Sequence, residues 1–98
     1  MITSKQRAVL RSLANPLETI EQIGKSGVAD TTVTQVDEAL TARELVKFRV
    51  LESCPITARE AAAELAEKVR AEVVQVIGYR FVLYRKNHNK PKEAQIKI

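Results

Sequence analysis

The sequence predicts a single compact α/β domain of the α+β type, in which three helices pack on a four-stranded mixed sheet. A chain of 98 residues has room for one hydrophobic core and not for two, and 45% of its residues are apolar. The hydrophobic period alternates between helical and strand values in the order α-β-α-β-α-β-β. Strands joined through helices tend to lie parallel, whereas a closing hairpin is antiparallel, so the sheet is expected to be mixed.

The first helix is expected at residues 4–14. Thr3 is a good N-cap residue, and Gln6 three positions later completes a capping box. The pair Asn15-Pro16 ends the helix, because the residue before a proline avoids the helical region. One face of this helix is apolar, and with the preceding residue it comprises Ile2, Val9, Leu10 and Leu13.

A short strand over 17–23 is expected to follow, ended by Gly24, and Asp30 is then expected to cap a second helix. A second strand is expected over 44–51, because its residues alternate between apolar and basic. The apolar side consists of Val46, Phe48 and Val50, and the basic side of Lys47 and Arg49. Since the basic side looks solvated, we expect the helices to cover one face of the sheet only.

The third helix begins after Pro55, where Thr57 and Glu60 form a second capping box. Its apolar stripe consists of Ala58, Ala61, Ala62, Leu65, Ala66 and Val69. Residues 73–77 and 80–85 are rich in strand-forming residues, and Gly78-Tyr79 between them predicts a tight hairpin. The folded domain is therefore expected over 1–86. Residues 87–98 are basic and lack a hydrophobic period, so we expect a flexible tail.

The composition points to a soluble, cytoplasmic protein. There is one cysteine, Cys54, so no disulfide can form within the chain. No apolar run is long enough to span a membrane or to act as a signal peptide. The net charge is +4, and residues 85–98 alone hold five Lys or Arg and one Glu. The rest is neutral as a whole, so it can bind an anion only if its charges are separated onto different faces.

The segment 22–30, with the sequence QIGKSGVAD, places Gly24, Lys25, Ser26 and Gly27 between the first strand and the second helix. Glycine permits positive φ and close backbone approach, and a helix N-terminus attracts anions. The spacing fits a phosphate site held by Lys25 and the backbone amides of Ser26 and Gly27, and it also fits a plain turn with an exposed lysine. It is neither a P-loop nor a dinucleotide fingerprint, whereas K-homology domains clamp a nucleic-acid backbone with a G-x-x-G loop.

Further basic residues could extend such a site, although each could also be an ordinary solvated cation. Arg7 and Arg11 lie four apart in the first helix, Lys47 and Arg49 share a strand face, and Arg80 and Arg85 flank the last strand. The third helix and its flanks are acidic, with carboxylates at Glu52, Glu60, Glu64, Glu67 and Glu72. The sequence thus separates its charges along the chain.

Three segments, QIGKSGV, ALTARELVKFRV and VVQVIGYRFVLYR, follow an N-terminal LRSLANPL in this order. Together they resemble the chloroplast RNA splicing and ribosome maturation (CRM) domain in its bacterial stand-alone form, over Thr3 to Arg85. The resemblance implies a fold similar to the C-terminal domain of translation initiation factor 3. It implies RNA as the partner, association with precursors of the large ribosomal subunit, and an RNA-binding loop at Gly24, Lys25, Ser26 and Gly27.

The residues indicate no enzyme chemistry, cofactor, metal site, membrane contact or small-molecule substrate. His88 lies in the polar tail and Cys54 has no partner at a recognisable spacing, so a catalytic pair is not indicated. We expect a monomer. The alternative function is a protein–protein interaction module that uses a sheet edge and the aromatic residues Tyr79, Phe81 and Tyr84. Steep salt dependence would favour nucleic-acid binding over this alternative.

Overall fold

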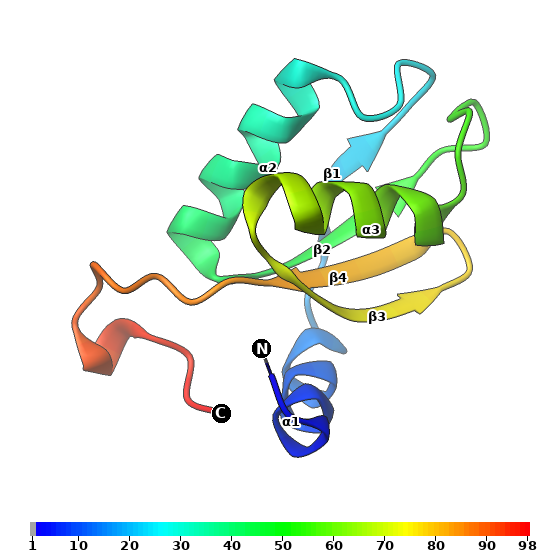
Figure 1. The fold of residues 1–98 in the computed structure, drawn as a ribbon. Helices are drawn as coiled ribbons and strands as arrows, with labels where there is room; N and C mark the ends of the chain where they lie inside the picture. Colours follow the sequence, from blue (N-terminus) through cyan, green and yellow to red (C-terminus); the bar gives the residue numbers. More distant parts are fainter. Residues whose placement is uncertain (1) are drawn as a thin grey trace.

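Three helices, four strands and one 3₁₀ turn make up the computed structural model, which describes residues 2–98 (Figure 1). The order α-β-α-β-α-β-β is confirmed. The elements are α1 (Ser4–Ala14), β1 (Thr19–Ile23), α2 (Asp30–Arg43), β2 (Leu45–Val50), α3 (Ala58–Val69), β3 (Glu72–Ile77), β4 (Arg80–Tyr84) and η1 (Lys92–Ala94).

The four strands form one mixed sheet in the order β1-β2-β4-β3. Strand β1 pairs with β2 in parallel and β3 pairs with β4 antiparallel, as the sequence predicts. Strand β4 also pairs antiparallel with β2, which the sequence pattern did not indicate. The hairpin turn holds Gly78 at a φ of 57°, which glycine adopts without strain. Strand β1 begins later than expected, because the Leu17 amide donates to the Ala14 carbonyl oxygen and turns the chain after α1.

Helices α2 and α3 cover one face of the sheet and enclose the larger core. The predicted apolar side of β2 faces them, and the rings of Phe48 and Phe81 stack with centroids 5.1 Å apart. The predicted stripe of α3 is confirmed, since all six of its residues are buried. Four of the six are alanines, whose short side chains let the helix approach the sheet closely.

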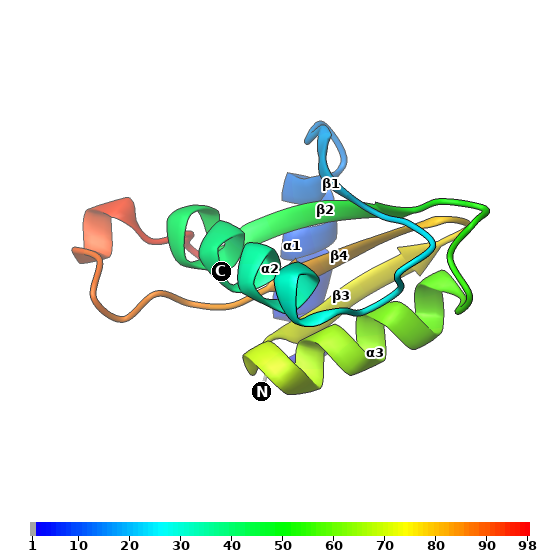
Figure 2. The same ribbon diagram turned by 90° about the horizontal axis from the view of Figure 1, so that it is seen from above.

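Helix α1 packs on the opposite face, so the expectation that helices cover only one face is wrong. In Figure 2 this helix lies behind the sheet, whereas α2 and α3 lie in front. The cause is a second apolar cluster, in which Leu10 and Ala14 meet the strand residues Leu45 and Val82. Sequence alternation correctly placed Lys47 and Arg49 on this face, but the other half of the face is apolar and needs cover.

The predicted bounds and capping box of α1 are confirmed, with Thr3 accepting from the Gln6 amide. Its predicted apolar face is only partly correct, because Val9 and Leu13 remain 38% and 43% exposed. The helix contacts the sheet along the line of Leu10 and Ala14, four residues apart. Val9 and Leu13 lie beside this line and stay in contact with solvent.

The two other helices differ at their N-termini. In α3 the capping box of Thr57 and Glu60 is confirmed, and the bonds from Thr57 lower the pKa of the Glu60 carboxyl. Asp30 was expected to cap α2, but it is the first helical residue, and Ala29 occupies the cap without a side-chain hydrogen bond. The first amides of α2 therefore have no side-chain cap.

The C-terminal segment folds back on the domain through the side chain of Glu44, which is fully buried at 0% exposure. One carboxylate oxygen accepts from the Asn87 amide at 2.7 Å and the other from the Ile96 amide at 2.8 Å. The Glu44 backbone has a φ of 64°, at which a non-glycine residue is uncommon. The sequence predicts a flexible tail over residues 87–98, and that flexibility stays a prediction.

Candidate functional site

Three loops meet at one end of the sheet, which we call the loop end and define as residues 24–29, 51–57 and 78–79. The carboxyl ends of the parallel strands β1 and β2 point to it, as does the β3–β4 hairpin (Figure 1). The Leu51 amide donates to the Ile23 carbonyl oxygen at 2.9 Å, and the Val50 amide donates to that of Tyr79 at 2.7 Å. These bonds hold the three loops in fixed relation to one another.

The G-x-x-G segment is a tight turn at this end. The Gly27 amide donates to the Gly24 carbonyl oxygen at 2.9 Å, and Gly27 has a φ of 61°. Lys25 and Ser26 are exposed at the tip of the turn. The sequence interpretation assigned the amides of Ser26 and Gly27 to a ligand. The structure corrects the second assignment, because the turn already uses the Gly27 amide.

The two glycines of the turn have different reasons to be glycine. A Cβ on Gly27 would lie 3.4 Å from the Pro55 side chain, and its positive φ would be strained for other residues. A Cβ on Gly24 would lie 3.7 Å from the Leu51 side chain, an ordinary contact, and Gly24 needs no positive φ. The fold therefore favours glycine at 27 but not at 24, where the missing side chain leaves the backbone open to a ligand.

The turn leads directly into the uncapped N-terminus of α2. The Thr32 hydroxyl donates to the Gly27 carbonyl oxygen at 3.3 Å and fixes the turn against the helix. The free amides and the helix dipole attract an anion here, and Lys25 adds a full positive charge. The exposed carboxylate of Asp30, in the first turn of α2, opposes this attraction.

Arg49 and Arg80 lie directly opposite each other on the antiparallel pair β2–β4, next to the loop end. Both are exposed, and neither forms an ion pair within residues 2–98. Like charges placed opposite each other destabilise a sheet. The neighbours across the strands are Gln22 on one side and Ile77 on the other, which are neutral. The pair therefore costs stability and concentrates positive charge.

Three more of the predicted cations, Lys47, Arg7 and Arg11, lie on or beside α1, on the same face of the sheet. The Lys47 ammonium donates to the Asn15 carbonyl oxygen at 3.3 Å, and the Arg7 Nε donates to that of Val73 at 3.3 Å. Arg11 is exposed in the last turn of α1. Arg85 is not available for a ligand, because its guanidinium bonds to Asp37, Thr41 and the Val69 carbonyl.

The two faces of the sheet consequently carry opposite charge. Helix α1 has three cations and no carboxylate, and the strand residues beside it add Lys47, Arg49 and Arg80 against the carboxylate of Glu72. Helices α2 and α3 on the other face hold six carboxylates and three cations. The separation of charge that the sequence suggested along the chain becomes a separation between faces.

Sequence reasoning did not assign the 51–57 loop or Ile77 to the candidate binding site, although both lie at or beside the loop end. A groove of about 610 Å³ runs between the 51–57 loop and the hairpin turn, with Pro55 and Tyr79 among its lining residues. Tyr79 is 58% exposed and Ile77 65% exposed, whereas Phe81 and Tyr84 are buried. Tyr79 is thus the aromatic residue that remains available from the predicted patch.

The structure places the two residues considered for catalysis apart. Cys54 lines the groove at the loop end, and His88 lines a cavity at the other end of the sheet. Within residues 2–98, no three His, Cys, Asp or Glu side chains gather in a way that would hold a metal ion. Among the helices of the same described residues, none is both long and apolar enough to cross a membrane.

A mixed sheet with one cationic face, and a glycine turn at the carboxyl ends of its parallel strands, defines a small α+β domain suited to an anionic ligand. A model of the CRS1/YhbY (CRM) domain family matches residues 2–85. The chain belongs to this family, which confirms the resemblance drawn from its sequence.

Known relatives cover nearly the whole chain. A protein of Bacillus subtilis named "Probable RNA-binding protein YqeI" is 44% identical over 89% of this chain and 91% of its own. An "RNA-binding protein" of Haemophilus influenzae is 28% identical over 99% of this chain and 94% of its own. The solution structure of SAV1595, a hypothetical Staphylococcus aureus protein described as a candidate RNA-binding protein, has a TM-score of 0.80 and 41% identity. It covers 99% of this chain and 100% of that one.

Proposed function

We propose that this protein binds RNA with the loop end and the α1 face of its sheet, and that it catalyses no reaction. The observation that carries the proposal is the charge difference between the two faces, because a polyanion is attracted to one and repelled by the other. The names of the relatives support RNA as the polyanion.

At the loop end, Lys25 and the Ser26 amide hold a backbone phosphate beside the N-terminus of α2. Because Gly24 has no side chain, the RNA strand can come close to the protein backbone there. Arg49 and Arg80 contact the next phosphates, and Tyr79 offers its ring to an unpaired base. The contacts continue over the α1 face through the cations already described, which are Arg7, Arg11 and Lys47.

The resemblance to the stand-alone bacterial domain supports a more specific role. The protein associates in the cytoplasm with precursor large-subunit ribosomal RNA or with the precursor particle, and it assists ribosome assembly as a monomer. RNA crosslinking in cell extract, followed by sequencing of the recovered RNA, tests this role. We expect one defined site in large-subunit RNA. Recovery of RNA without any preferred site, or of proteins alone, would contradict the role.

One observation favours a second candidate, a protein-interaction module. Leu13, Leu17 and Ile20 are each more than a third exposed and line one hollow beside Lys47. Such a patch suits a protein partner. Salt separates the two candidates, because a phosphate contact on a single strand contributes about 0.7 to the slope of log affinity against log salt. Binding through this apolar patch would change little with salt.

The opposed arginines give a prediction in which stability and binding change in different directions. Replacing Arg49 with glutamine removes the repulsion from Arg80, so the free energy of unfolding is expected to stay the same or rise by up to about 0.5 kcal/mol. The salt slope of RNA binding should fall by about 0.7. Urea unfolding and fluorescence anisotropy measure the two quantities. A loss of stability together with unchanged binding would show that the pair serves the fold.

A further inference from the structure

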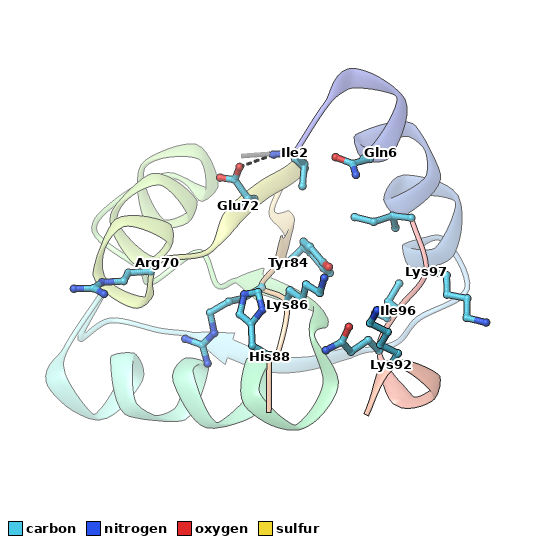
Figure 3. A pocket seen from close by; sticks show the side chains of 13 residues that line it. Ile2, Gln6, Arg70, Glu72, Tyr84, Lys86, His88, Lys92, Ile96 and Lys97 are labelled. Atoms are coloured by element: carbon cyan, nitrogen blue, oxygen red, sulfur yellow. Dashed lines mark hydrogen bonds between the residues drawn. The ribbon is translucent and has the colours of Figure 1, made fainter. Parts of the chain in front are cut away.

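A second basic surface lies at the end of the sheet opposite the loop end. There the C-terminal segment, the start of α1 and the adjoining ends of β3 and β4 surround a cavity of about 900 Å³ (Figure 3). Figure 3 shows Tyr84 and Lys86 near its centre, with Ile2 and Gln6 on one side and Lys92 on another. The described residues that line it come from sequence positions 2–6, 70–72 and 84–98.

The cavity carries excess positive charge. Arg70, Lys86, Lys92 and Lys97 line it, and none of these four side chains makes a hydrogen bond or ion pair within residues 2–98. Among the described residues of the lining, Glu72 has the one acidic side chain, and its carboxylate accepts from the Ile2 amide at 2.9 Å. Because several unpaired cations face one hollow, an anion would be drawn into it.

The segment that supplies most of these cations is held in a defined shape. Its two ends bond to the two carboxylate oxygens of Glu44, as described above. The Gln95 side-chain amide closes the loop from within by donating to the carbonyl oxygens of Asn87 and Lys90. The Lys90 ammonium donates to the Ala42 carbonyl oxygen at 2.6 Å, at the C-terminal end of α2. The lysines of this segment therefore project from a folded loop.

We propose that this cavity is a second RNA-backbone site, which binds the same RNA that the loop end holds. The proposal rests on the proposed function. Helix α1 begins at the cavity, where Gln6 lines it, and ends beside Lys47 on the basic side of β2. It contributes Lys5, Arg7 and Arg11 without a carboxylate, so the positive charge continues between the two sites. RNA bound to both sites crosses the α1 face of the domain.

A charge-matched pair of variants tests the site. The tail variant K86Q/K92Q removes two cations from the cavity, and the control variant R59Q/K68Q removes two from α3 on the acidic face. The probe is a fluorescein-labelled single-stranded oligoribonucleotide of about 20 uridines, titrated at several salt concentrations. We expect the slope of log affinity against log salt to fall by about 1.4 in the tail variant, two contacts at 0.7 each, and to stay unchanged in the control.

Two outcomes overturn the proposal. One is a tail variant whose salt slope equals that of the wild type. The other is an equal fall of the salt slope in the α3 control, which would indicate that the RNA is attracted by net charge alone. Parallel titration of G27D separates this inference from the proposed function. If the tail variant binds more weakly while G27D binds normally, the cavity is supported as an RNA site and the role of the 24–27 loop is rejected. Absence of binding by the wild type would reject both.

A third variant distinguishes a formed site from a loose basic tail. E44Q leaves every cation in place and raises the net charge by one unit, but it weakens the anchoring of the segment, because it removes one of the two acceptors. If the cavity is a formed site, the affinity of folded E44Q for the same probe falls in spite of its higher positive charge. Equal or tighter binding would overturn the proposal. Circular dichroism confirms that the variant is folded at the temperature of the titration.

Discussion

Replacement of Glu44 with glutamine is expected to lower the free energy of unfolding by about 2 kcal/mol, because it removes a charged acceptor from a buried site. Each carboxylate oxygen accepts from one backbone amide of the C-terminal segment. Glutamine keeps one acceptor, and its NH₂ group would face the second amide donor. For a domain of this size the melting temperature should fall by roughly 10 °C.

Urea unfolding followed by circular dichroism measures this change, and Glu38→Gln is the matched control. Glu38 is an exposed carboxylate in α2 for which no hydrogen bond or ion pair is found within residues 2–98. A second measurement uses Tyr84. Burial raises the pKa of its hydroxyl, and the Glu44 charge raises it further. Glu44→Gln should therefore lower the Tyr84 pKa part of the way back to the ordinary value of a tyrosine, because the effect of burial remains. Equal stability of the Glu44 and Glu38 variants would contradict the anchoring role.

Replacement of Gly27 with aspartate is expected to weaken RNA binding at least about tenfold, or 1.4 kcal/mol, because a negative charge would then lie beside the phosphate. The fold should persist with a loss of about 1 kcal/mol, since a residue other than glycine is strained at this φ. The added Cβ would lie 3.4 Å from Pro55, which is close but not a clash. Anisotropy titration with an RNA oligonucleotide measures the affinity, and urea unfolding measures the stability.

Gly27→Asn is the matched control, because asparagine has the shape of aspartate, tolerates positive φ similarly and carries no charge. It should lose the same stability as the aspartate variant and keep most of the affinity. Gly24→Ala tests the other glycine, whose Cβ the fold can accommodate. It should leave stability unchanged while reducing RNA affinity. If both Gly27 variants bind RNA as the wild type does, the turn does not contact the backbone.

Local patterns were enough to predict most of the elements. The two Thr-initiated capping boxes, the alternation in β2 and the alanine stripe of α3 each depend on residues within a few positions of one another. The G-x-x-G turn was also visible, because glycine spacing reports backbone conformation. Asp30 misled the prediction, since a cap residue type can occupy the first helical position as well as the cap.

The sequence by itself determined the α+β class, the order of the elements, the mixed sheet and the family, because period, caps and turns are encoded by near neighbours. Only the tertiary structure decided that α1 lies on the face opposite α2 and α3, and that the charges therefore divide between two faces. It also set Arg49 opposite Arg80 and tied Glu44 to Ile96, which are 52 positions apart. Such contacts depend on how whole elements pack, and no local pattern records which distant residues will meet.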